Sequence, residues 1–196
     1  MKKIILAASM ALVLGACATA SNPGAMVADL TENNIISETS KLANAVTVES
    51  VSGGQETNPL WTSEVSDSDF AEALRQSLAA HAILATDEGD YKLTAELVKL
   101  KQPVLGGFNM SVTSDVKYTL TSVETGEVVY EDMVSEKYTA EMGDAFLGVE
   151  RLRLANEGSI KQNISTMLTN LIAEFEEDDA GSEGGSVMTE DVVSSK

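Results

Sequence analysis

The stretch FNMSVTSDVKYTL, residues 108–120, alternates between two kinds of side chain over its whole length. One parity is mostly apolar and contains Phe108, Met110, Val112, Ser114, Val116, Tyr118 and Leu120. The other parity is polar and contains Ser111, Thr113, Asp115, Lys117 and Thr119. A period of two is that of a β-strand, whose successive side chains point to opposite faces. The stretch therefore predicts a strand with one face in a core and the other in water.

The segments on either side of this strand predict two more strands. The turn VETGE, residues 123–127, supplies Gly126 for a positive φ and predicts a hairpin. A further strand follows at 127–140, and its irregular parity indicates a bulge. On the N-terminal side, YKLTAELVKL alternates over residues 91–100 and QPVLGG, residues 102–107, turns the chain.

Two helices and a first strand complete the pattern. NAVTVESV predicts a strand at 44–51, which the glycines at 53 and 54 end. Ser66 is a good N-cap for a helix at 67–84, in which apolar residues recur every four positions. A second helix begins near Asp144 or Val149 and ends near Glu177, although Gly158 costs about 1 kcal/mol relative to Ala.

The order β-α-β-β-β-α, with one apolar face on the strands, predicts an α+β fold. It is a two-layer sandwich of a four-stranded mixed sheet with both helices on one face. This domain spans 43–177. Residues 17–42 lack steady periodicity and predict a tether with room for one ordered turn. Residues 178–196 are acidic and rich in Gly and Ser, which predicts a disordered tail.

The N-terminus has the pattern of an export signal. Two lysines precede an apolar run at 4–14, which as a helix of about 16 Å is too short to cross a ~30 Å hydrocarbon core. Residues 1–16 therefore predict a signal peptide. Its end, Leu14-Gly15-Ala16-Cys17, resembles the lipobox of bacterial lipoproteins. The alternative is an ordinary signal peptide in which Cys17 is incidental.

The lipobox resemblance implies a membrane anchor. In such proteins the thiol, here Cys17, carries diacylglycerol, cleavage falls before the cysteine, and the new amino group carries an acyl chain. Two or more chains hold a protein stably on a bilayer. Ala18 follows, where an Asp would favour the inner membrane, so the resemblance implies the periplasmic face of the outer membrane.

Composition argues against several functional classes. The net charge of −18 becomes −20 once residues 1–16 and their two lysines are removed, which disfavours nucleic acid and anionic surfaces. His81 is the single histidine and lies in the apolar stripe of its helix, so we interpret it as a residue at the core edge. With Cys17 modified, no ordinary zinc site and no disulfide is expected. We predict no catalytic residues, no metal and no cofactor, hence a non-enzymatic protein.

Three segments, ETNPLWTSEV (56–65), YTL (118–120) and DAFLGVERLRLANEGSIKQNI (144–164), resemble an uncharacterised family of Gram-negative bacterial lipoproteins. The element order behind a lipobox also resembles the lipopolysaccharide-assembly lipoprotein. In the last segment, Glu150–Arg153 and Glu157–Lys161 have the spacing of helix-supporting ion pairs.

The predicted topology places the connections 52–66, 101–107 and 140–148 at one end of the sandwich. The tether and the tail would leave from the other end, so these loops should point away from the anchor. Their candidates for binding a partner are Pro59, Leu60, Trp61, Leu105, Phe146 and Leu147. The alternative is a small loop core in which Trp61 packs on Phe146.

Two functions remain open, and a third possibility, a hydrolase, would need His81 beside a carboxylate and a serine in a cleft. The first is an accessory or assembly factor that docks onto an envelope complex through exposed loops. The second is a periplasmic carrier of a small apolar or lipid ligand, which predicts a cavity of several hundred cubic ångströms between sheet and helices. The sequence leaves the oligomeric state open.

Overall fold

The computed structural model describes residues 18–37, 39–58, 62–103 and 107–183, with side chains as far as Glu176. Its elements follow in the order η1 (Pro23–Met26), β1 (Val46–Ser52), α1 (Asp67–Ala80), β2 (Tyr91–Lys101), β3 (Met110–Ser122), β4 (Val128–Ala140) and α2 (Gly148–Glu183). The predicted order of strands and helices is confirmed.

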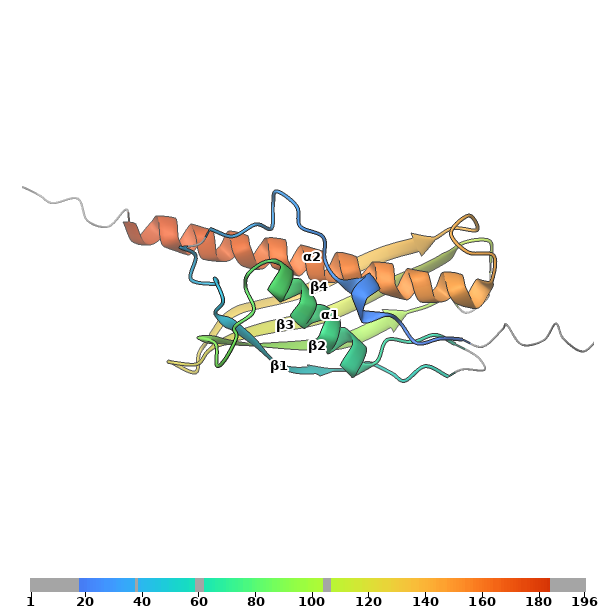
Figure 1. The fold of residues 1–196 in the computed structure, drawn as a ribbon, viewed down its shortest axis with the longest axis horizontal. Helices are drawn as coiled ribbons and strands as arrows, with labels where there is room; N and C mark the ends of the chain where they lie inside the picture. The colour runs from blue at the N-terminus through green and yellow to red at the C-terminus, as the bar shows by residue number, and fades with distance from the viewer. Residues whose placement is uncertain (1–17, 38, 59–61, 104–106, 184–196) are drawn as a thin grey trace, which may run out of the picture.

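The four strands form one mixed sheet in the order β1-β2-β3-β4. β1 and β2 are parallel, whereas β2–β3 and β3–β4 are antiparallel. Both helices lie on one face of this sheet, with α1 over β1 and α2 over β3 and β4 (Figure 1). The even-numbered residues of β3 from Met110 to Leu120 are all buried beneath them. The predicted two-layer α+β sandwich is confirmed.

The crossover between the parallel strands is made by α1, as parallel pairing requires. Ser66 caps this helix by accepting a hydrogen bond from the Asp69 N–H at 3.1 Å. The helix ends at Ala80 rather than at residue 84, because Ala82 adopts a left-handed φ of 57° that cannot continue an α-helix.

The hairpin between β3 and β4 has the expected features. Gly126 adopts a φ of +72°. The predicted bulge in β4 is present: Leu120 pairs with Tyr130 and Thr121 with Val128, so Val129 is an extra residue.

The predicted start of β3 is wrong, since Phe108 precedes the strand. The partner strand β4 ends opposite Met110, at Ala140, and leaves Phe108 nothing to pair with.

The largest correction concerns the predicted tether at 17–42. Met26 and Leu42 are fully buried and belong to the main core, and η1 packs against both α1 and α2 (Figure 1). The Ala28 N–H donates to Ser77 Oγ of α1 at 3.0 Å. The segment from Ala18 to Leu42 is therefore part of the folded domain, because it covers apolar surface that the two helices share.

The predicted end of the second helix and of the domain, near Glu177, is also wrong. α2 continues past Glu177 to Glu183, because adding a residue to an existing helix gains one hydrogen bond at little further cost. Residues 184–196 of the predicted tail lie outside the described residues, as do the predicted signal peptide at 1–16 and Cys17.

Candidate functional site

The described parts of the connections 53–66, 102–109 and 141–147 meet at one end of the molecule, which we call the loop end (Figure 1). Gln102, just after β2, joins the first connection to α2. Its Nε2 lies 3.0 Å from the Ser63 carbonyl, 3.0 Å from Glu64 Oε2 and 3.1 Å from Asn156 Oδ1. Asn156 on α2 also donates to the Ser63 carbonyl, at 2.8 Å. The buried polar groups of this junction thus hold the loop in one position.

Glu64 takes part in this junction, and none of its partners among the described residues is a cation. Burial raises the pKa of its carboxyl group, and hydrogen bonds from Thr62 and Gln102 partly offset that rise. The junction therefore contains a partly buried carboxylate that accepts hydrogen bonds from uncharged donors.

Arg151 braces the other two connections. Its guanidinium donates to the carbonyls of Ala145 at 2.7 Å, Phe146 at 2.9 Å and Gly107 at 3.1 Å. Because Arg151 is itself buried, these bonds tie the loop before α2 to the loop before β3. Its role here is structural, and the backbone that carries Phe146 is firmly held.

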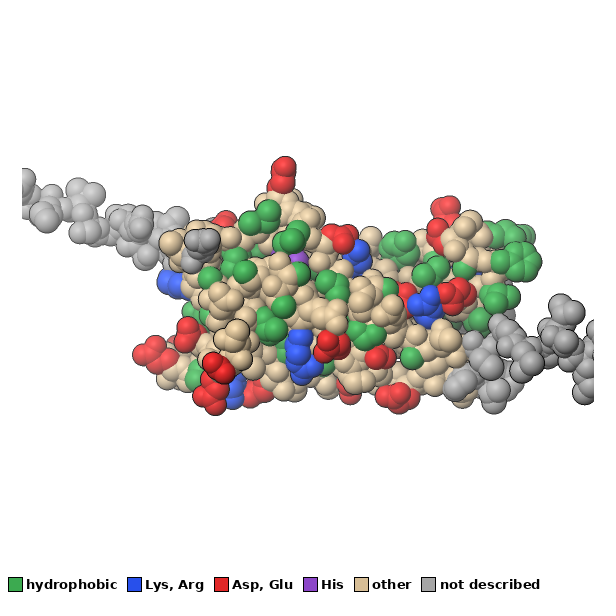
Figure 2. Space-filling model, viewed as in Figure 1, with side chains coloured by type: hydrophobic (Ala, Val, Ile, Leu, Met, Phe, Trp, Pro, Cys, Tyr) green, Lys and Arg blue, Asp and Glu red, His purple; other side chains and the backbone are tan. Residues whose placement is uncertain are grey.

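Four large apolar side chains project from this braced backbone, and we call them the apolar tip. Their exposed fractions are 77% for Phe108, 47% for Met142, 85% for Phe146 and 46% for Leu147. Figure 2 shows apolar side chains gathered at this end of the molecule. The alternative of a loop core in which Trp61 packs on Phe146 involves a residue outside the described ranges.

The remaining predicted candidates, Pro59, Leu60, Trp61 and Leu105, lie outside the described residues. Sequence reasoning missed two members of the apolar tip. Phe108 was assigned to the strand because it continued the alternation, and Met142 stands alone among polar residues, so no periodic signal could identify it.

The first described residues also lie at the loop end. Ser63 Oγ donates to the Thr19 carbonyl at 2.8 Å, and Ser21 Oγ donates to the Glu64 carbonyl at 3.0 Å. From there the chain runs along the helical layer to the start of β1 at the opposite end (Figure 1). The prediction that the loops point away from the N-terminal attachment is therefore wrong. The segment doubles back instead of extending beyond β1, whereas α2 does end at the opposite end.

The N-terminal segment also changes the expected ion pairs on α2. Arg153 pairs with Glu150, as predicted, and with Glu157 at 2.5 Å. Glu157 also accepts from the Asn22 N–H at 2.7 Å, and Lys161 pairs with Asp29 at 2.8 Å. The predicted Glu157–Lys161 pair is wrong, because the segment supplies each of them with another partner.

The pKa values of the two glutamates that bind Arg153 move in opposite directions. Burial raises the pKa of Glu157, against the hydrogen bond from Asn22 and the attraction of Arg153. The hydrogen bond from Arg153 lowers the pKa of Glu150, which is more exposed.

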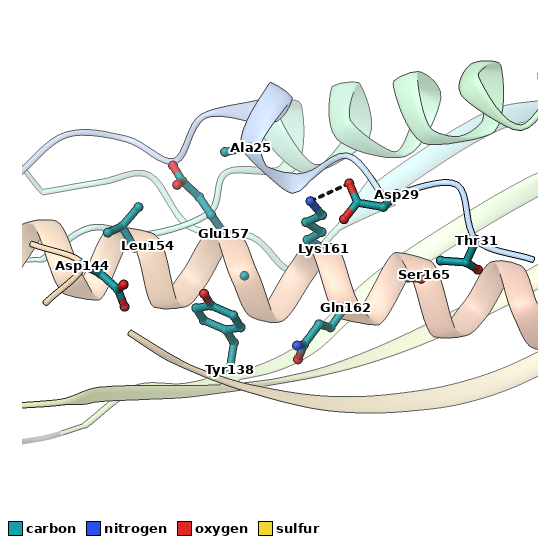
Figure 3. A pocket seen from close by; sticks show the side chains of 11 residues that line it. Ala25, Asp29, Thr31, Tyr138, Asp144, Leu154, Glu157, Lys161, Gln162 and Ser165 are labelled. Carbon is teal, nitrogen blue, oxygen red and sulfur yellow. Dashed lines mark ion pairs between the residues drawn. The ribbon is translucent and has the colours of Figure 1, made fainter. Parts of the chain in front are cut away.

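A pocket of about 520 Å³ lies along α2 beside this cluster, between the N-terminal segment and Tyr138 of β4 (Figure 3). Seven of its eleven lining residues are polar or charged: Asp29, Thr31, Asp144, Glu157, Lys161, Gln162 and Ser165. The Lys161–Asp29 pair reaches across its upper side (Figure 3). The pocket is therefore on the outer side of α2 and is not the expected apolar cavity between the sheet and the helices.

The interpretation of His81 as a residue of the apolar stripe agrees with its burial. Its Nδ1 lies 2.6 Å from the Ser77 carbonyl one turn earlier, so its recorded partner is backbone. Within the ranges that the structure describes, no group of three His, Cys, Asp or Glu side chains is placed to hold a metal ion. None of the helices in these ranges has the length and apolarity to cross a bilayer.

No protein-family model and no curated protein matches this sequence. Among solved structures, the fold is similar to that of a Xanthomonas campestris protein of the family DUF330, with a TM-score of 0.59 and 11% identity over 83% of this chain and 99% of that one. At this identity the likeness concerns the fold alone.

Two other structures are less similar. The PelC dodecamer of Paraburkholderia phytofirmans gives a TM-score of 0.44 with 15% identity, covering 67% of this chain and 88% of that one. A minor lipoprotein of Acinetobacter baumannii gives 0.37 with 10% identity, covering 54% and 84%. These lower scores carry no conclusion about this chain.

Proposed function

We propose that this protein is a lipid-anchored lipoprotein of the bacterial cell envelope, held on the periplasmic face of the outer membrane. The sequence Leu14-Gly15-Ala16-Cys17 carries this proposal. The structure supports it in one respect: Ala18, the residue that follows the lipobox cysteine, is buried, so the fold holds the chain next to Cys17. The anchor would therefore hold the domain close to the bilayer surface.

The anchor is tested by the Cys17→Ser variant expressed in a Gram-negative host. We expect the variant to leave the membrane fraction or to accumulate as an uncleaved precursor, whereas Ser21→Ala, four residues later, is processed normally. Mass spectrometry of the wild-type N-terminal peptide should show Cys17 with two ester-linked chains and one amide-linked chain. A mature form that begins after Cys17, or that bears a free thiol there, contradicts the proposal. Density-gradient separation of the two membranes tests the outer-membrane assignment.

For the domain itself we propose a non-enzymatic accessory or assembly role, comparable to that implied by the resemblance to the lipopolysaccharide-assembly lipoprotein. Two observations support this over hydrolysis or transfer. The single histidine is buried and bonded to a backbone carbonyl rather than to a carboxylate. The outer face of the sheet, which the described helices do not cover, is mostly polar, with half-buried residues on β3 and exposed ones on β2 and β4, and it offers a surface for a partner.

The alternative, a carrier of an apolar ligand, fits the structure less well. The space between the sheet and α2 is filled by large buried side chains such as Tyr118, Ile164 and Met167. The pocket beside α2 offers charged groups, which an apolar ligand would have to desolvate at a cost.

Crosslinking in intact cells separates the two functions. A photoreactive residue at position 133, on the outer face of β4, would sample the sheet face, and another at position 61 would test the predicted partner-binding residue Trp61. An accessory factor should give a discrete protein adduct from at least one position, and the captured protein should retrieve this one in the reverse experiment. Recovery of a bound small apolar molecule from the purified protein, with no protein adduct, would favour the carrier.

A further inference from the structure

We propose that the apolar tip inserts into the surface of the bilayer that holds the anchor, so that the protein stands on the membrane on its loop end. This inference rests on the proposed function, because it requires acyl chains on Cys17. It adds an orientation and a second membrane contact that the anchor alone does not provide.

The position of the anchor relative to the tip is the first observation. Cys17 is covalently joined to Ala18, so their Cα atoms are about 3.8 Å apart. The next residue, Thr19, is bonded through Ser63 to Asn156 of α2. Arg151, five positions earlier on the same helix and hence about 7.5 Å along its axis, holds the Phe146 carbonyl. Rigid contacts therefore join the site of acylation to the apolar tip.

The chemistry of the tip is the second observation. Phe108, Phe146 and Leu147 are the kinds of side chain that interfacial membrane contacts use. A cluster of exposed apolar groups marks an interaction site. Because an acylated Cys17 must lie at the bilayer, lipid is the apolar phase nearest to this cluster. The bonds of Arg151 hold the tip in place, so insertion would need little ordering of the loop.

The distribution of charge is the third observation. The two loops at the opposite end, 85–90 and 122–127, contain the acidic residues Asp87, Glu88, Asp90, Glu124 and Glu127 and no Lys or Arg. The loop-end connections also contain acidic residues, namely Glu56, Glu64, Glu141 and Asp144, and no Lys or Arg, and Asp144 accepts a hydrogen bond from the Glu141 N–H at 2.7 Å. Acidic groups are repelled from an anionic membrane surface, so neither end offers an electrostatic contact with anionic lipid. The contact is therefore apolar rather than electrostatic, and zwitterionic lipid should suffice for it.

The mature lipoprotein would carry no free thiol, so a single new cysteine can be labelled. Gly143→Cys places an environment-sensitive fluorophore beside the tip without removing any of its four apolar side chains, and a Cβ there meets no atom within 4 Å. Glu124→Cys, exposed at the opposite end, is the matched control. Both are reconstituted as full-length acylated protein into phosphatidylcholine vesicles that contain a lipid with a quencher on its acyl chain. We expect several-fold stronger quenching at 143 than at 124.

A second variant tests the side chains themselves. In the Gly143→Cys background, Phe146→Ser with Leu147→Ser should abolish the quenching while the protein still sediments with the vesicles. The control Met133→Ser removes an exposed apolar side chain from the sheet face and should leave the quenching unchanged.

Three results would overturn the inference. Equal quenching at both positions in vesicle-bound protein would show that the anchor holds the domain without a fixed orientation. In intact cells, a photocrosslink from position 143 to an envelope protein instead of to lipid would make the tip a protein-docking site. The vesicles are sedimented before any fluorescence is read. If the acylated protein then stays in the supernatant, as a protein without acyl chains would, the proposed function and this inference are contradicted together.

Discussion

Asn163 of α2 joins the two layers of the fold at the level of single atoms. It is fully buried, and it accepts a hydrogen bond from the Tyr118 hydroxyl at 2.9 Å. Its Nδ2 donates to the backbone carbonyls of Ser114 at 3.0 Å and Val134 at 2.9 Å. Burial raises the pKa of Tyr118 well above its usual range, so the hydroxyl keeps its proton and remains a donor. One amide side chain thus satisfies groups from β3 and β4 that have no access to water.

The Asn163→Ala variant should lower the free energy of unfolding by about 2–4 kcal/mol, because buried polar groups would lose their partners. Asn170→Ala is the matched control on the same helix, since Asn170 makes an exposed bond to Asp132 and should change stability by less than about 0.5 kcal/mol. Urea unfolding followed by circular dichroism measures both. Equal effects of the two substitutions would contradict the importance of this network.

Glu64 makes the stability of the loop end depend on pH. Its pKa in the folded state lies above the unfolded value of about 4.5, so the folded state binds the proton more tightly. The resulting stabilisation is fully present below the unfolded pKa and is lost as the pH rises through the folded pKa. Glu64→Gln should remove this contribution, and the free energy of unfolding should fall less steeply from pH 4.5 upward than in the wild type.

This pH dependence is measured by urea unfolding at a series of pH values between 4 and 7. The exposed Glu56→Gln variant, from the same loop, controls for the loss of one negative charge. A Glu64→Gln curve that runs parallel to the wild type over the whole series would show that Glu64 does not contribute.

At the scale of elements, α2 can lie close to β4 because Gly158 of the helix has no side chain. A Cβ on Gly158 would lie 2.4 Å from the ring of Tyr138, which rests on the helix there. In an exposed helix, replacing Gly by Ala gains about 1 kcal/mol. Here the ring occupies the space that the methyl group needs, so Gly158 permits the contact between the helix and the edge strand.

We therefore expect Gly158→Ala to destabilise the protein by about 1–3 kcal/mol, the usual cost of overpacking. The sign is opposite to that expected from helix propensity. In the Tyr138→Ala background the same substitution should become neutral or stabilising, which a double-mutant cycle of thermal unfolding would detect. A stabilising effect of Gly158→Ala in the wild-type background would refute the contact.

At the scale of the whole molecule, the N-terminal segment closes the domain. It starts at the loop end, crosses the helical layer through η1 and delivers Leu42 to the core just before β1 (Figure 1). Lys161 and Glu157 of α2 both bind it, through Asp29 and Asn22. An acyl group on Cys17 would therefore be attached to the folded body itself.

If the segment were a tether, shortening its side chains would not affect stability. We expect Met26→Ala to cost about 2–5 kcal/mol, because Met26 is fully buried in the main core. Leu30→Ala, in the same segment but exposed, should cost less than about 0.5 kcal/mol. Calorimetry of both variants decides between a tether and an integral part of the core, since a tether predicts two equal and small effects.

Several features followed from local sequence because each is a property of one element. The parity of residues 110–120 determined which face of β3 is buried, and Ser66 marked the start of α1, since both signals depend only on neighbouring residues. The broken parity after Gly126 indicated a bulge in β4 for the same reason, and the structure places it at Val129. Together with the order of the elements, these signals were sufficient for the two-layer fold and for the end at which the loops gather.

Other features were decided only by tertiary structure. Met26 is buried by surfaces that α1 and α2 create jointly, so its own segment carries no periodic signal of burial. Lys161 exchanges its expected partner on the helix for Asp29, because the segment passes above it. The direction of that segment also brings Ala18 to the loop end. A periodic pattern describes one face of one element, whereas the packing of an irregular segment depends on the surface that distant elements form together, and this is why the position of the anchor relative to the apolar tip required the structure.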